Sequence, residues 1–131
     1  MTKLEALINQ SQSALKQFEK VLQQEKNEYI RDSAIKRFEI VFDLSWKLIK
    51  AFLEEKGIVC VSPKGCFQEA YKQGVIEYDV YWINLISDRN YAVHTYKEAL
   101  AEKIYKDLPS ALIFFQKLLS AIQKAKAKEN H

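Results

Sequence analysis

The sequence predicts an all-α fold: an up-and-down bundle of four to five helices in a single domain over residues 1–131. Only three Gly and two Pro interrupt the chain, which is 48% apolar and 28% charged, as globular proteins are. Apolar residues also recur at the spacing of one helix face through most of the sequence. A chain of this length buries a sufficient core without disulfides or metals.

The first two helices are predicted from this periodicity. Over residues 4–22 the apolar positions fall one helical turn apart, at Leu4, Leu7, Ile8, Leu15, Phe18 and Leu22. A polar link over residues 23–28 precedes a longer helix, predicted over 29–56. Gly57 follows it, and glycine is the residue best suited to a left-handed C-terminal cap.

The second helix carries two adjacent apolar stripes. One consists of Ala34, Phe38, Val41, Leu48 and Phe52, and the other of Ile35, Phe42, Trp46, Ile49 and Leu53. A stripe of about 100° suffices to face one core, so the doubled stripe favours contact with a second subunit. The alternative, in which this is the central helix of a single subunit, stays open. We interpret the opposite face as solvated and self-paired, with Lys36, Glu39, Asp43, Lys47, Lys50 and Glu54.

A third helix is predicted over residues 63–73. Ser62 and Pro63 are typical of a helix start, and Gly74 is typical of a stop. The short apolar run over 58–61 has no visible partner strand, so we expect it to be a loop.

Two further helices complete the predicted bundle. The fourth is expected over residues 78–94 and the fifth over 97–126. Pro109 lies inside the fifth, where proline either kinks a helix or starts a new segment.

Charge and hydropathy exclude two classes of protein. The 20 basic and 17 acidic residues are interspersed, with a net charge of +3, so neither half is a nucleic-acid arm. No apolar stretch approaches the roughly 20 residues of a membrane span. We therefore expect a cytoplasmic protein that makes no contact with membranes.

Cysteine and histidine usage exclude several kinds of site. Cys60 and Cys66 have no second pair and no nearby histidine, so they make neither a zinc cage nor a Cys-x-x-C redox motif. We expect two buried or idle thiols. Because His131 is the last residue, His94 is the only internal imidazole. A multi-histidine metal site within one chain is thus excluded, and we expect neither a metal nor a cofactor.

The most informative stretch runs from residue 88 to 96. It places a cation, an amide, the internal imidazole and a phenol close together, at Arg89, Asn90, His94 and Tyr96. On a regular helix Arg89 and His94 lie about 140° apart, so either Arg89 reaches around the helix or the helix distorts. We expect the helix to end near His94 and the next turn to bring Tyr96 back. Guanidinium, imidazole and amide together suit a ligand that contains phosphate.

Structural interpretations of the same residues stay open. Arg89 could pair with Asp88 or with a carboxylate of the second helix, leaving His94 as a satisfied helix-end residue. Four aromatic residues nearby could stack nucleic-acid bases or belong to a core or interface: Tyr78, Tyr81, Tyr91 and Trp82.

The motif resembles a known family. The order Arg89-Asn90-x-x-x-His94-x-Tyr96 is similar to the Arg-x4-6-His pattern of HEPN domains, and its His-x-Tyr is the mark of their HepT-like branch. Over about residues 30–105 the chain also resembles the nucleotidyltransferase substrate-binding protein subfamily. The matching positions are Arg31-Asp32, Ile35, Arg37-Phe38-Glu39, Leu44-Ser45-Trp46-Lys47, Ser62-Pro63, Gly74-Val75-Ile76 and Trp82.

The resemblance implies a HEPN-like homodimer that works with a minimal nucleotidyltransferase, as the toxin of a toxin-antitoxin pair and a metal-independent endoribonuclease. His94 would be the general base or general acid, and Arg89 would stabilise charge on the phosphoryl group. Asn90 would orient His94 or the phosphate, and Tyr96 would receive AMP from the partner. One histidine cannot be acid and base at once, so this chemistry requires a cleft that two chains share.

Two alternatives remain. The first is a noncatalytic nucleotide- or substrate-binding subunit of a two-component nucleotidyltransferase. Scattered lysines suit this role, or a narrow RNA substrate, better than a grip on long RNA, which usually needs a basic stripe. The second is a helical adaptor in which the motif serves only structure.

Overall fold

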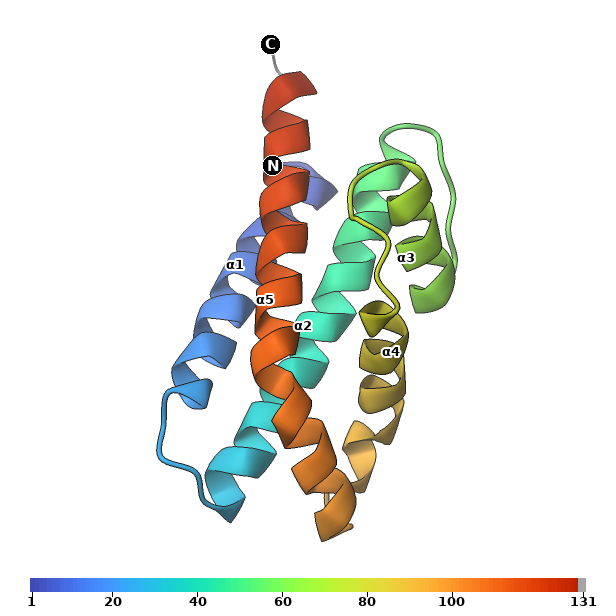
Figure 1. Ribbon diagram of the computed structural model, residues 1–131. Coiled ribbons are helices and arrows are strands. Elements are labelled where there is room, and N and C mark those ends of the chain that lie inside the picture. Colours follow the sequence, from blue (N-terminus) through green and yellow to red (C-terminus); the bar gives the residue numbers. More distant parts are fainter. Residues whose placement is uncertain (130–131) are drawn as a thin grey trace.

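The computed structural model describes residues 1–129, and over that range its regular elements are all helical. In chain order they are α1 (Lys3–Leu22), α2 (Glu28–Glu54), α3 (Pro63–Lys72), α4 (Tyr81–Tyr91), the 3-10 helix η1 (Ala92–His94) and α5 (Glu98–Glu129). Figure 1 shows the long helices α1, α2 and α5 side by side, with α3 and α4 on the other flank of α2. The predicted all-α bundle is confirmed. The prediction for His131 lies outside the described residues.

Side-chain caps begin the first three helices. Thr2 and Glu5 form a capping box, in which Thr2 Oγ1 accepts from the Glu5 N–H at 3.1 Å and Glu5 Oε2 accepts from the Thr2 N–H at 3.3 Å. Asn27 and Ser62 cap α2 and α3, each accepting a backbone N–H three residues further on. These bonds satisfy donors that a helix start otherwise leaves unpaired.

Glycines follow the ends of α2 and α3, as predicted. Gly57 has a φ of 76° and Gly74 a φ of 75°. Glycine alone enters this left-handed region without steric cost, so both positions favour glycine by backbone conformation.

The central helix α2 buries both apolar stripes inside one chain. It packs against α1 and α5 on one flank and against α3, α4 and η1 on the other. Nine of the ten stripe residues are buried, and Trp46 is half-buried. Neighbours within the same subunit therefore account for the width of the buried face. The doubled stripe is therefore no longer evidence for a second subunit, and the homodimer stays a prediction.

A chain of aromatic rings joins the two flanks of the bundle. The Phe38 ring lies 6.1 Å from Phe115 and 6.2 Å from Phe42. Phe42 lies 5.8 Å from Phe67 of α3, which stacks on Trp82 of α4 at 6.1 Å. Fully buried rings of this size dominate core energetics, so this chain of contacts holds α4 in place against α2.

Pro109 lies inside the continuous helix α5. Of the two predicted outcomes, a new helical segment is therefore wrong. Proline removes one backbone hydrogen bond and crowds the preceding turn, which bends a helix. In Figure 1 the first turns of α5 lean away from its straight C-terminal part.

The prediction of idle thiols is wrong. Cys60 and Cys66 are buried, as expected, but they form a disulfide across a Cα–Cα distance of 5.1 Å. The segment before α3 folds back beside its first turn, which brings the two sulfur atoms together. Sequence spacing alone did not show this approach.

No helix within residues 1–129 has the length and apolar character needed to cross a membrane. The cytoplasmic location stays a prediction.

Candidate functional site

The motif residues lie where α4 ends. This helix begins at Tyr81, whose N–H donates to Asp79 Oδ1 at 2.9 Å, and so starts later than the predicted residue 78. After Tyr91 the backbone tightens into η1, which ends at His94. The predicted end near His94 is therefore confirmed. A 3-10 turn advances by about 120° per residue instead of 100°, so the helix distorts at the point where the motif required it.

Arg89 turns towards α2. Its Nε donates to Asp43 Oδ1 at 3.0 Å and its Nη2 to Oδ2 at 3.1 Å, while Nη1 lies 3.4 Å from Glu39 Oε2. The hydrogen bonds with Asp43, together with the charges of both carboxylates, raise the pKa of Arg89 above its usual value. The side chain remains 25% exposed. One guanidinium thus faces two carboxylates, and Lys36 Nζ lies 3.9 Å from Glu39 Oε2, so these four charges sum to zero.

The pairing with a carboxylate of the second helix is the structural alternative that the sequence left open. It corrects the interpretation of the polar line on α2 as self-paired and solvated. Lys36 and Lys50 do lie within 4.0 Å of Glu39 and Glu54. The Glu39 side chain, however, is only 13% exposed, because α4 brings Arg89 over this part of the line.

His94 and Tyr96 meet as predicted. His94 Nδ1 and the Tyr96 hydroxyl are 3.0 Å apart, and the two rings meet edge to face with their centroids 5.6 Å apart. Tyr96 is 75% exposed, whereas His94 is half-buried. An imidazole this close can accept the phenolic proton, so the pair is chemically competent for reactions at the phenol oxygen.

Asn90 lies apart from both groups. Within residues 1–129 its side chain makes no hydrogen bond to Arg89 or His94. With Tyr91, Ser87 and Lys64 it lines a hollow of about 380 Å³ between α3 and α4. The four side chains were expected to converge, but they lie in three places. His94 contacts Tyr96, Arg89 pairs with carboxylates of α2, and Asn90 lines this hollow.

A buried carboxylate that the sequence motif does not single out lies beside these residues. Asp88 is 2% exposed, its Oδ1 accepts from Lys103 Nζ at 2.6 Å, and its Oδ2 has no partner within the described residues. Burial, aided by the neighbouring Asp107 carboxyl, raises the pKa of Asp88 to about 7, although Lys103 opposes the shift. The signal was present in the sequence, because Asp88 shares one helix face with Leu85 and Ala92, both of which are buried.

Two of the four candidate base-stacking residues belong to the core. Trp82 is buried against Phe67, and the Tyr81 hydroxyl donates to the Asp107 carbonyl at 2.8 Å. Tyr78 and Tyr91 are exposed. The core interpretation therefore holds for the first two. No cluster of three His, Cys, Asp or Glu side chains suited to a metal ion occurs within residues 1–129.

Comparison with known families settles the relationship of the chain. A family model described as nucleotidyltransferase substrate binding protein like matches residues 6–124. The chain belongs to this family. The HEPN and HepT-like resemblance of the motif points to the same family and is confirmed. A comparison with curated proteins gives no match.

Two solved structures resemble this member of the nucleotidyltransferase substrate binding protein-like family. A crystal structure of a protein from Thermus thermophilus has a TM-score of 0.81 at 31% identity, covering 86% of this chain and 98% of the other. The structure of HI0074 from Haemophilus influenzae is described as revealing the fold of a substrate binding domain of a nucleotidyltransferase. It has a TM-score of 0.68 at 24% identity, covering 92% of this chain and 96% of its own. This second likeness shows the fold.

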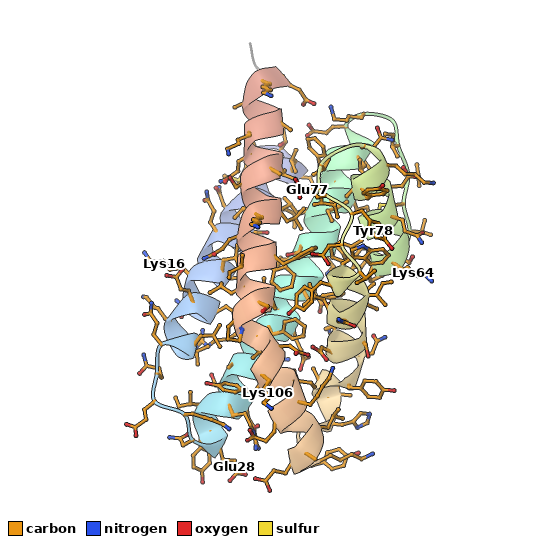
Figure 2. All side chains as sticks on the ribbon, viewed as in Figure 1. Lys16, Glu28, Lys64, Glu77, Tyr78 and Lys106 are labelled. Carbon is orange, nitrogen blue, oxygen red and sulfur yellow. A yellow bond between two sulfur atoms is a disulfide. The ribbon has the colours of Figure 1, made fainter. Side chains whose placement is uncertain are left out.

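The family member also has a larger cavity, away from the motif. Figure 1 shows the connection between α3 and α4 running beside α5, and a cavity of about 720 Å³ lies between them. Its volume is typical of small-molecule sites. Figure 2 shows Glu77 on this connection, on the side towards α5. The sequence alone does not reveal this cavity, because only the tertiary fold brings its two walls together.

Proposed function

We propose that the chain is the noncatalytic substrate-binding subunit of a two-component nucleotidyltransferase. Membership of the family supports a role beside a nucleotidyltransferase. The observation that supports a noncatalytic role is the pairing of Arg89 with two carboxylates of α2, those of Asp43 and Glu39.

This pairing disfavours ribonuclease chemistry. A phosphoryl group that develops charge needs a donor that is free to approach it. Here Asp43 accepts hydrogen bonds from Nε and Nη2 of Arg89, and Glu39 lies 3.4 Å from Nη1, so each guanidinium nitrogen already has a carboxylate partner. Turning Arg89 towards a phosphate would break its two hydrogen bonds with Asp43.

The partner would be a minimal nucleotidyltransferase that holds the nucleotide, while this chain presents the acceptor. The description of HI0074 as a substrate binding domain of a nucleotidyltransferase supports this division of labour. We also propose that the chain forms a homodimer. Exposed apolar side chains on α4 and η1 support a protein contact there: Ile83, Tyr91 and Val93 are 50%, 52% and 60% exposed.

A second candidate is the HepT-like toxin with endoribonuclease activity through Arg89 and His94. The contact of 3.0 Å between His94 Nδ1 and the exposed Tyr96 hydroxyl favours it. If the partner supplies ATP, the Tyr96 oxygen would bond to the α-phosphorus, the bond to the β-phosphate oxygen would break, and pyrophosphate would leave. His94 would take the phenolic proton. AMP on Tyr96 would then add bulk and negative charge at this end of the bundle.

The two candidates are separated by incubating the purified chain with a mixed tRNA pool. We expect no cleavage above that seen with His94→Ala, and the same result for Arg89→Ala. Circular dichroism at the assay temperature confirms that both variants are folded. Cleavage by the wild-type chain that both substitutions abolish would establish the ribonuclease instead.

A further inference from the structure

The cavity of about 720 Å³ between α5 and the α3–α4 connection has one polar and one apolar part. The apolar part is formed by Ile76 of the connection and by Ile113, Phe114 and Leu118 of α5. The polar part has carboxylates on the connection, at Glu77 and Asp79, and an ammonium on α5, at Lys117. A few polar groups on largely apolar walls are typical of a small-molecule site.

The charged side chains of this cavity are all exposed: Glu77, Asp79 and Lys117. Within residues 1–129 neither Glu77 nor Lys117 makes an ion pair at 4.0 Å or less. Asp79 Oδ1 accepts the backbone N–H of Tyr81 but has no cationic partner there. Two carboxylates against one ammonium give the lining a net charge of −1, which favours a cationic ligand.

Tyr81 lies in the wall of the cavity beside Asp79. Its hydroxyl donates to the Asp107 carbonyl at 2.8 Å, which fixes the ring in the wall. Burial raises the pKa of Tyr81 to about 12, and the carboxylates of Asp107, Asp88 and Asp79 contribute to the rise. Of these carboxylates, Asp79 lines the cavity and would attract a cation, whereas Asp88 and Asp107 are already paired with Lys103.

Aromatic rings add to this preference. The Tyr81 and Phe114 rings meet edge to face with centroids 6.3 Å apart, and both line the cavity. The face of an aromatic ring attracts an ammonium group within about 6 Å. A nucleoside triphosphate carries the opposite charge and is disfavoured here.

We infer that this cavity binds the acceptor substrate of the complex as an organic amine. Its ammonium group lies by Glu77 and Asp79, and its apolar body packs against Phe114 and the aliphatic wall. The role of this amine as acceptor rests on the proposed function, whereas binding of the amine is a property of this chain alone.

Three probes of matched shape test the inference: 2-phenylethylammonium, 2-phenylethanol and 3-phenylpropionate. Each is titrated into the full-length 15N-labelled chain, and amide shifts are followed at Ile76, Ser110 and Phe114. We expect saturable shifts with the ammonium probe, weaker binding of the alcohol and the weakest binding of the carboxylate.

Charge substitutions on the two walls sharpen the test. Glu77→Gln should weaken binding of the ammonium probe about fivefold, and Lys117→Gln should strengthen it, since one partly screened charge is removed in each case. Glu25→Gln, on the exposed link between α1 and α2, is the matched control and should change nothing. The inference is overturned by absent saturable shifts, by a carboxylate or alcohol that binds as tightly as the amine, or by equal effects of Glu77→Gln and Glu25→Gln.

Failure here is distinguishable from failure of the proposed function. If the amine does not bind but the complex still transfers nucleotide only when this chain is present, the site is wrong and the substrate-binding role stands. If the amine binds but transfer is independent of this chain, the site stands and the link to an acceptor fails.

Discussion

Replacing Asp88 with asparagine should remove a distinctive pH dependence from the stability of the bundle. Asp88 is buried beside Asp107 and contacts Lys103 with only one of its oxygens. Its pKa of about 7 in the folded protein compares with a usual value of 3.8. Between these two pH values the folded state holds a proton that the unfolded chain has released, so stability falls as pH rises from about 4 to about 7.

The size of this effect follows from the pKa shift. A rise of three units corresponds to about 4 kcal/mol in the free energy of unfolding, at roughly 1.4 kcal/mol per unit. An asparagine side chain cannot ionise, so Asp88→Asn should lose this slope. We expect the variant and the wild type to differ little near pH 4, and the variant to be the more stable protein above pH 7.

Urea denaturation at several pH values between 4 and 8 measures this difference directly. All other titrating groups are shared, so the difference between the two curves reports the titration of Asp88 together with its coupling to Asp107 and Lys103. Lys103→Met provides a second check, because loss of the ammonium should raise the pKa of Asp88 further and move the slope to higher pH. Parallel curves for wild type and Asp88→Asn would show that the pKa of Asp88 is not raised in the folded protein.

Four further predictions concern stability and are checked by urea denaturation at pH 5. Phe67→Ala should cost about 3–5 kcal/mol, since its fully buried ring joins α3 to both α2 and α4; a loss below about 1 kcal/mol would contradict that packing. Thr2→Ala should cost about 1 kcal/mol by breaking the capping box, whereas Thr2→Ser should cost little. Reducing the Cys60–Cys66 disulfide should cost about 2 kcal/mol for a loop this short, and a double serine variant should not respond to reductant. Arg89→Met should cost about 1–2 kcal/mol because its two carboxylates lose their shared cation, and Arg89→Lys should recover only part of that loss.

The fold could be predicted largely from local signals. Caps such as Ser62, stops such as Gly57 and Gly74, and a period of 3.6 residues are properties of neighbouring residues, and the structure keeps them. The sequence also predicted the width of the buried face of α2. It did not predict what covers this face, because periodicity shows how much of a helix is buried but not whether the covering helix belongs to the same chain.

The sequence predicted which residues belong to the site but not all of the contacts that they make. His94 and Tyr96 are two residues apart, so the end of a helix between them sufficed to predict their contact. Arg89 and Asp43 are separated by 46 residues, and the choice of Asp43 depends on how α4 lies on α2. Asp88 could have been singled out, since a carboxylate on the same face as Leu85 is a buried polar group that needs an explanation.

The most direct test of the central claim follows the nucleotide. The chain is combined with the minimal nucleotidyltransferase proposed as its partner, α-32P-labelled nucleoside triphosphates and an extract of cellular small molecules, and the position of the label is determined. A substrate-binding subunit predicts label in the small-molecule fraction, only when both proteins are present, with transfer unchanged in Tyr96→Phe. Label bound covalently to this chain and lost in Tyr96→Phe would contradict the account and establish the HepT-like toxin instead.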